Sequence, residues 1–111
     1  MEVRLAGTII PLDPMNEAGQ GQTHNRRAGE YLTKLIKGKV VDVKAYGLDE
    51  RDRVLAEVYF EGLNINLEMI RAGVVIVDPA ASLGRLDLEP YRKAQEEARK
   101  ARRGIWAIID K

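Results

Sequence analysis

The chain has 111 residues, of which 45% are hydrophobic and 32% are charged, and its formal net charge is +1. These values are typical of one globular domain, residues 1–111, and exclude a disordered chain. A net charge near zero excludes a global field that attracts nucleic acid, so any such affinity needs a local patch. Because the chain has no cysteine, disulfides and thiolate metal sites are also excluded.

The apolar stretches of the sequence are a few residues long, far shorter than a membrane span. The first residues also lack the pattern of a secretory signal peptide. The sequence therefore predicts a soluble protein that does not bind membranes, and it leaves the cellular compartment undetermined.

The first third of the chain predicts a strand, a long loop and a helix. Residues 1–7 alternate, with Val3 and Leu5 on one face and Arg4 on the other. Residues 8–25 are polar and rich in proline and glycine, which predicts a long loop of the kind that is often functional in small domains. Apolar side chains then recur at three- and four-residue steps, which predicts a helix over 26–36.

The middle of the chain predicts a hairpin and a short helix. Residues 39–46 and 51–60 both alternate with a period of two, and the turn between them favours antiparallel pairing. Asn66 is predicted to be the N-cap of the short helix. Gly73 is predicted to end that helix in a left-handed conformation.

The last helix is predicted over residues 89–103, with Pro90 in its first turn and Gly104 after its end. Ile105 and Trp106 are then expected to fold back onto the core. The side chains predicted to face the core form a stripe of Tyr91, Ala94, Ala98 and Ala101.

Several short motifs follow one another along nearly the whole chain. They are Val3-Arg4-Leu5-Ala6-Gly7, Gly38-Lys39-Val40, Arg53-x-Leu55-Ala56, Asn66-x-x-Met69-Ile70-x-x-Gly73 and Arg103-Gly104-Ile105-Trp106. Each motif alone is weak, but their joint order and spacing resembles the staphylococcal nuclease-like family. The resemblance implies an α+β fold, an OB-fold-like antiparallel β-barrel with three helices. Compared with that family, the chain is expected to lack the first two barrel strands.

Active members of this family hydrolyse phosphodiesters in DNA and RNA with a Ca²⁺ ion, two phosphate-binding arginines, metal-binding carboxylates and a glutamate base. By motif position, Arg4 and Arg53 match the two arginines, whose guanidinium groups suit phosphate oxygens. Ile9 stands at the position of a metal aspartate and Leu12 at that of the base. Neither hydrocarbon side chain can ligate calcium or accept a proton.

Two further family features are absent by the same comparison. The other metal aspartate of the family lies upstream of the strand that carries Arg4. Two tyrosines that contact the nucleotide in active members correspond here to Pro79 and Ala81. The resemblance therefore implies that the phosphate ligands are kept while the hydrolytic residues are lost.

Three interpretations stay open. In the first, which we favour, the domain has lost phosphodiester hydrolysis and binds single-stranded nucleic acid or protein through Arg4 and Arg53, without metal or cofactor. In the second, an insertion shifts the alignment, so that Asp13 binds Ca²⁺ and Glu17 acts as base, with His24 assisting. In the third, the domain is a purely structural part of an assembly.

Simpler explanations exist for the same residues. The two arginines could form surface ion pairs with Glu57, with Asp52 or with each other's neighbours, which would stabilise the fold little. If an aromatic ring contacts a base, Tyr46 and Tyr59 are better candidates than Tyr91, which is at a helix packing position.

The expected lack of two barrel strands has a consequence for assembly. Residues 1–7 would form an edge strand with unpaired N–H and C=O groups, beside an open part of the core. Exposed edges and apolar patches are commonly covered by another chain. The sequence therefore predicts a symmetric homodimer, or docking of this edge to a missing part of a larger protein.

Overall fold

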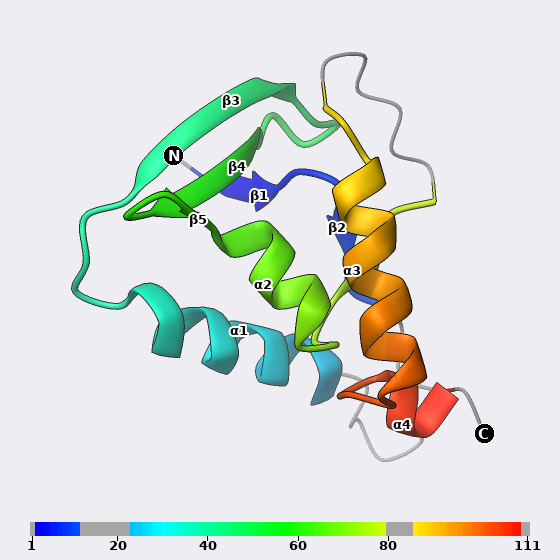
Figure 1. Cartoon of the computed structure of the whole chain (residues 1–111). Helices are drawn as coiled ribbons and strands as arrows, with labels where there is room; N and C mark the ends of the chain where they lie inside the picture. Colours follow the sequence, from blue (N-terminus) through cyan, green and yellow to red (C-terminus); the bar gives the residue numbers. More distant parts are fainter. Residues whose placement is uncertain (1, 12–22, 80–85, 110–111) are drawn as a thin grey trace.

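The structure is a computed structural model that describes residues 2–11, 23–79 and 86–109 (Figure 1). Its larger sheet has four strands. β4 (Val54–Phe60) lies between β1 (Val3–Leu5), which is parallel to it, and β3 (Asp42–Leu48), which is antiparallel. The short β5 (Leu63–Asn64) turns back along β4. A second sheet pairs β2 (Thr8–Ile9) with β6 (Ile76–Val77) in antiparallel fashion.

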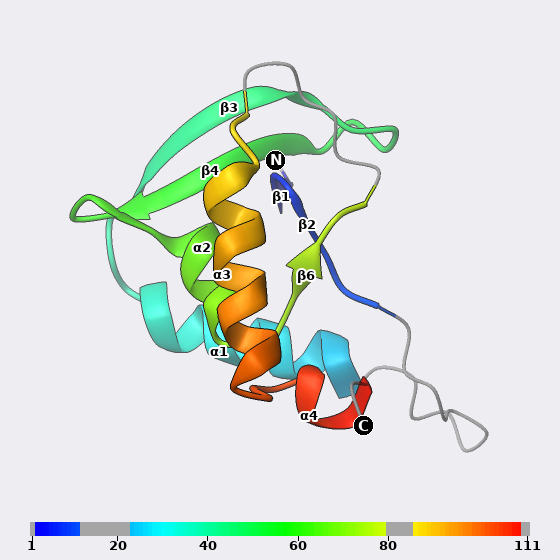
Figure 2. The same cartoon turned by 45° about the vertical axis from the view of Figure 1, so that its right-hand side comes forward.

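The helices pack against the concave side and one end of the larger sheet. α2 (Ile65–Arg71) lies between the sheet and α1 (Thr23–Ile36), and α3 (Glu89–Lys100) packs along α2 and β6 (Figures 1 and 2). α4 (Trp106–Ile109) is a single turn beyond the three predicted helices. Among the described residues, none of the helices is long and apolar enough to cross a membrane.

The predicted hairpin is confirmed, since β3 and β4 pair antiparallel over most of their length. Two features differ from the expected antiparallel barrel: β1 is parallel to β4, and the described strands form two sheets that do not close into a barrel. Parallel neighbours need a long crossover between them, and α1 and β3 supply it. The first helix also begins earlier than predicted, so His24 lies in α1 and not in a loop.

The N-cap of α2 differs from the prediction. Asn64, not Asn66, caps the helix, and its side chain accepts a hydrogen bond from the backbone N–H of Leu67 at 3.1 Å. Asn66 is instead fully buried inside the fold. Asparagine suits both places, so the local sequence alone does not decide between them.

α2 and α3 end through backbone hydrogen bonds of the same type. Gly73 follows α2 with a φ of 77°, which confirms the predicted left-handed conformation. α3 ends three residues before the predicted position, because Arg102 adopts a φ of 54° and interrupts the helix. Ile105 is buried, in agreement with the prediction that the segment after α3 folds back onto the core.

Candidate functional site

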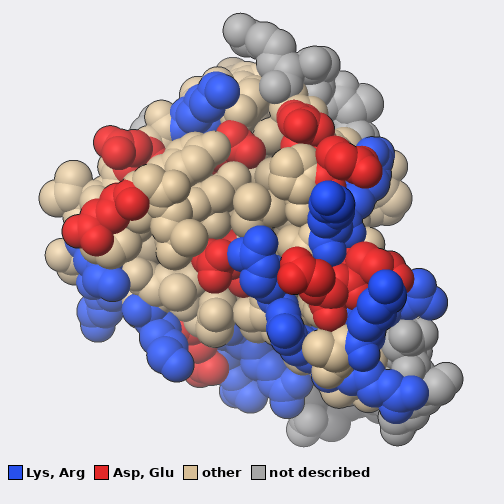
Figure 3. All heavy atoms as spheres, viewed as in Figure 1, with Lys and Arg blue, Asp and Glu red and all other residues tan. Residues whose placement is uncertain are grey.

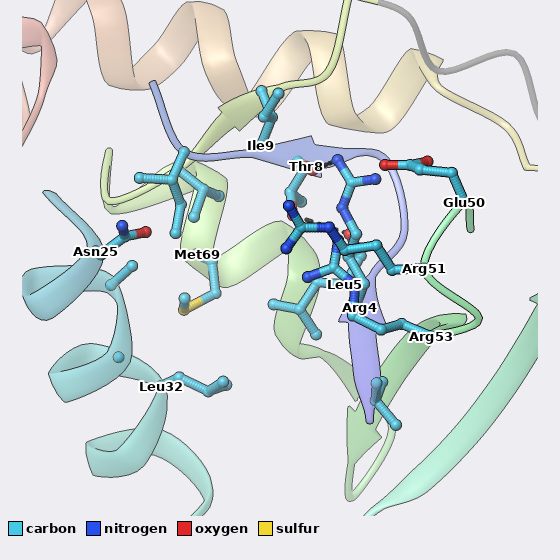
Figure 4. Close-up of a pocket in the computed structure, with 15 residues that line it drawn as sticks. Arg4, Leu5, Thr8, Ile9, Asn25, Leu32, Glu50, Arg51, Arg53 and Met69 are labelled. Atoms are coloured by element: carbon cyan, nitrogen blue, oxygen red, sulfur yellow. Dashed lines mark hydrogen bonds between the residues drawn. The ribbon is translucent and has the colours of Figure 1, made fainter. Parts of the chain in front are cut away.

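Arg4 and Arg53, the two predicted phosphate ligands, line one cavity of about 540 Å³. It lies between β1, β2, the loop before β4 and α1 (Figure 4). Arg51 and Glu50 also line it, and Figure 4 shows the three guanidinium groups close together, with Glu50 at their edge. The rest of the lining is mostly apolar and includes Leu5, Ile10, Ala28, Leu32, Met69 and Val75.

Asp49 holds Arg53 in position. Its carboxylate accepts hydrogen bonds from the backbone N–H groups of Arg51 at 2.9 Å and Arg53 at 2.8 Å, and from Nε of Arg53 at 2.7 Å. Burial alone would raise the pKa of Asp49, but the hydrogen bonds from Arg53 and Arg51 outweigh it and lower the pKa. Because only Nε of Arg53 is used, its two terminal nitrogens have no hydrogen-bond partner among the described residues.

Arg4 is held by a residue far away in the sequence. One terminal nitrogen donates to a carboxylate oxygen of Asp78 at 3.3 Å and to the carbonyl oxygen of Thr8 at 3.4 Å. Both arginines thus form ion pairs, as the simpler explanation expected, but their partners are Asp78 and Asp49 and not Glu57 or Asp52. The Arg4–Asp78 pair is partly exposed, so it orients the guanidinium group more than it stabilises the fold.

Arg51 was not identified from the sequence as a site residue. Its backbone is fixed by Asp49, and its guanidinium group has no partner among the described residues. The available signal was its place two positions before Arg53, beside a carboxylate that favours a turn. From the sequence alone, an arginine in a charged turn that lines a cavity cannot be told from one that only contacts water.

The other positions singled out from the sequence have different outcomes. Ile9 lines the cavity, and in Figure 4 its side chain points away from the guanidinium groups. His24 is buried and lines a separate cavity of about 20 Å³ with Gly73. Asp13 and Glu17 lie outside the described residues. The positions Leu12 and Ala81 lie outside them as well, and Pro79 is exposed at the end of the described segment.

Within residues 2–11, 23–79 and 86–109, no three histidine or carboxylate side chains are grouped so that they could hold a metal ion. The calcium site of the second interpretation therefore depends on Asp13, which stays a prediction.

Glu57 is the centre of a buried hydrogen-bond cluster, although the strand pattern did not single it out. Only 6% of its surface is exposed. Its carboxylate accepts hydrogen bonds from the hydroxyl groups of Tyr46 at 2.7 Å, Tyr91 at 2.7 Å and Tyr59 at 3.0 Å, and from the side-chain amide of Asn64 at 3.4 Å. Tyr46 and Tyr59, the candidates for base stacking, are thus held by this carboxylate.

The cluster keeps Glu57 charged. Burial alone would raise the pKa of Glu57, but the hydrogen bonds from the three tyrosines and Asn64 outweigh it and lower the pKa below 4.5. Burial and the neighbouring carboxylate raise the pKa of Tyr91 and of Tyr59, so both phenols stay protonated donors. The cluster joins α3 to β3 and β4.

We expect Glu57 to contribute stability that is lost in acid. Because its folded pKa lies below the unfolded value of 4.5, the contribution is complete above that pH and disappears as the pH falls through the folded pKa. Glu57→Gln should lower the free energy of unfolding at pH 7 by about 2 kcal/mol and flatten its decline in acid. Urea unfolding between neutral and acid pH measures both effects. Glu96→Gln, at an exposed position of α3, is the control. An equal acid decline in native and Glu57→Gln proteins would contradict the expectation.

Comparison with known proteins shows the family and the fold of this chain. A sequence model of the family described as staphylococcal nuclease homologue matches residues 2–108. The chain belongs to that family. Among solved structures, this nuclease homologue is similar to the extended Tudor domain of Drosophila melanogaster Tudor-SN (p100), with a TM-score of 0.70 and 19% identity, over 92% of this chain and 45% of that one. Family and structural match together confirm the predicted OB-like α+β fold.

Several curated relatives carry nuclease names. The nuclease homologue is 34% identical to the probable endonuclease LCL3 of Leptosphaeria maculans, over 96% of this chain and 38% of the relative. It is 32% identical to the probable endonuclease LCL3 of Komagataella phaffii, over 97% and 50%. It is also 32% identical to an uncharacterized endonuclease of Escherichia coli O157:H7, over 80% and 56%. The chain thus spans about two fifths to just over half the length of these relatives.

Proposed function

We propose that this nuclease homologue binds the phosphate groups of single-stranded nucleic acid through Arg4, Arg51 and Arg53, without hydrolysing them. The observation that carries the proposal is the gathering of three guanidinium groups in one cavity, where Glu50 is the only carboxylate among the described lining residues. Guanidinium groups bind phosphate oxygens through paired, charge-assisted hydrogen bonds.

The local geometry favours phosphate binding at Arg53 and Arg51 first. Asp49 holds Arg53 through Nε, so the two terminal nitrogens can bind a phosphate without losing that ion pair. Arg4 would contribute after exchanging Asp78 for the phosphate, at little cost because their pair is partly exposed. The apolar part of the cavity offers a surface to sugars or bases, which a flexible single strand can turn towards it.

The loss of hydrolysis is supported by the sequence position of Ile9, where the family resemblance implies a metal-binding carboxylate, because a hydrocarbon side chain cannot ligate calcium. A second function is favoured by the relatives' names, which describe probable endonucleases. In that case Asp13 would bind Ca²⁺ and Glu17 would act as base beside Arg4 and Arg53. A purely structural role in an assembly is the third alternative.

One binding and cleavage experiment separates these functions. The protein is mixed with labelled single-stranded DNA or RNA, with Ca²⁺ or with chelator, at two salt concentrations. We expect salt-sensitive binding without cleavage, weakened about tenfold by Arg53→Ala or Arg51→Ala, with a salt dependence smaller by about one phosphate contact. Arg92→Ala, at an exposed position of α3, should leave binding unchanged.

The other results would overturn the proposal in different ways. Ca²⁺-dependent cleavage that disappears in Glu17→Gln would show an active endonuclease. A folded protein that neither binds nor cleaves would favour the structural role. Binding that is weakened equally by Arg92→Ala would show a diffuse charge effect and not a site at this cavity.

A further inference from the structure

β3 has one unpaired edge. It pairs with β4 along one side, and no described strand pairs with its other side. Figures 1 and 2 show β3 as the outermost strand of the larger sheet. At seven residues it is as long as β4. A long edge strand offers a row of free backbone N–H and C=O groups to another strand.

Exposed apolar side chains gather on and beside this strand. Of the six large hydrophobic side chains that are exposed in the described residues, three lie there: Val40 at 92%, Val43 at 50% and Leu48 at 61%. In Figure 3 uncharged atoms dominate the surface over β3 and β4, whereas charged side chains crowd the area over α3. Apolar surface beside an open edge favours a protein partner over water.

The charges of β3 indicate which strand would fit. From these observations we propose that β3 pairs with β3 of a second copy, which gives a two-fold symmetric dimer with one continuous sheet. In such a pair, a two-fold axis perpendicular to the sheet places one residue opposite its own copy. If that residue is Val43, then Asp42 of each copy lies opposite Lys44 of the other. Two ion pairs form on one face, and Val43 meets Val43 on the other.

The neighbouring registers are less favourable. Centring the axis on Asp42 opposes two carboxylates, and centring it on Lys44 opposes two ammonium groups. Centring it on Ala45 forms no ion pair. Beyond Ala45 the register with β4 shifts, so regular pairing is limited to the first part of β3. Charge pattern therefore selects Val43 as the centre.

The residues required for this pairing are accessible. Asp42 and Lys44 are both exposed, and the Asp42 carboxylate forms no ion pair within the described part of the chain. The Lys44 ammonium lies over the ring of Tyr46, 5.3 Å from its centroid, and would leave this weak contact to pair with Asp42 of the second copy. The free edge of β1 is a weaker candidate, because that strand has three residues and Arg4 is already bound to Asp78. The dimer uses neither Arg51 nor Arg53, so it is independent of the proposed phosphate binding.

Two charge variants and their mixture test the dimer. Analytical ultracentrifugation of the native protein should show dimers that increase with concentration and decrease with salt. Asp42→Lys alone and Lys44→Asp alone each place like charges opposite one another twice, so each should be monomeric where the native protein is dimeric. Mixing the two variants restores both ion pairs, so the mixture should form a heterodimer. Lys93→Asp, with the same charge change at an exposed position of α3, should stay dimeric.

A native protein that stays monomeric at all concentrations would overturn the proposal. So would a dimer that survives Asp42→Lys, or a mixture of the two variants that stays monomeric. Lys44 lies opposite Glu57 on β4, so Lys44→Asp is first checked for folding by circular dichroism. Asp42 lies opposite Tyr59, and its replacement tests the dimer even if the other variant does not fold.

Discussion

Replacing Asn66 with alanine is expected to lower the free energy of unfolding by about 4 kcal/mol, a large part of the stability of a small domain. The Asn66 side chain donates hydrogen bonds to the carbonyl oxygens of Ala6 at 3.1 Å and Ala56 at 3.0 Å, and it accepts one from the N–H of Val58 at 3.2 Å. All three bonds are buried, so alanine would leave polar backbone groups without water or a replacement partner.

The same substitution should loosen the arrangement of the phosphate site. The Asn66 side chain links α2 to the backbone of Ala6, just after β1, and to the backbone of Ala56, in β4. β1 carries Arg4, and β4 begins just after Arg53. Asn66→Ala should therefore weaken nucleic-acid binding even under conditions where the protein is still folded. Urea unfolding and binding to single-stranded DNA measure the two effects separately.

Asn64→Ala is the matched control, because it makes the same chemical change two residues earlier. It removes the N-cap of α2 and two long hydrogen bonds, and should cost only about 1 kcal/mol. Equal destabilisation by the two substitutions would contradict the structural role assigned to Asn66. Asn66→Asp should not restore stability, because it replaces two donated hydrogen bonds with a buried charge.

The elements that the sequence predicts correctly are those determined by local chemistry. The alternation of residues on either side of the turn predicts the β3–β4 hairpin, and Gly73 marks the end of α2. The choice between Asn64 and Asn66 depends instead on burial. The alternation along residues 51–60 did not single out Glu57, because a local pattern cannot show that Tyr91, from α3, covers its face of the strand.

The sequence identifies only part of the candidate site, because the rest depends on contacts between residues that are distant in the sequence. Arg4 and Arg53 are identified through family motifs, and the structure places both in one cavity, while their role stays a prediction. Asp78, which orients Arg4, lies 74 residues away in the sequence, so no local pattern can connect the two. Arg51 lines the cavity in a loop whose backbone is fixed by Asp49. The Asp49 carboxylate accepts hydrogen bonds from the N–H groups of Arg51 and Arg53.

Replacing Gly73 with alanine should be at least as damaging as the loss of Asn66. Gly73 has a φ of 77°, and the N–H groups of Gly73 and Val74 donate to carbonyl oxygens of the last turn of α2. A left-handed alanine alone costs about 1 kcal/mol. An added Cβ would also overlap the backbone carbonyl group of Arg103, which cannot move aside like the end of a flexible side chain.

The crowding arises because two chain segments meet backbone to backbone at this point. Gly104 has a φ of 54°, and a Cβ on it would overlap the carbonyl group of Gly73 in turn. The carbonyl oxygen of Gly73 also accepts a hydrogen bond from the N–H of Ile105 at 2.8 Å. Strain and overlap together should cost about 4 kcal/mol or more, measured by urea and thermal unfolding.

Gly29→Ala is the matched control for Gly73→Ala. Gly29 lies in α1, and a Cβ added there would meet no atom within 4 Å apart from its chain neighbours and the backbone of its own helix. Alanine there should stabilise the protein by about 0.5–1 kcal/mol, because it favours the helix and reduces the freedom of the unfolded chain. The two substitutions are chemically identical, so opposite signs would isolate the effect of backbone contact. A cost near 1 kcal/mol for Gly73→Ala would mean that the segment after α3 moves away freely, and that its contact with α2 contributes little to the fold.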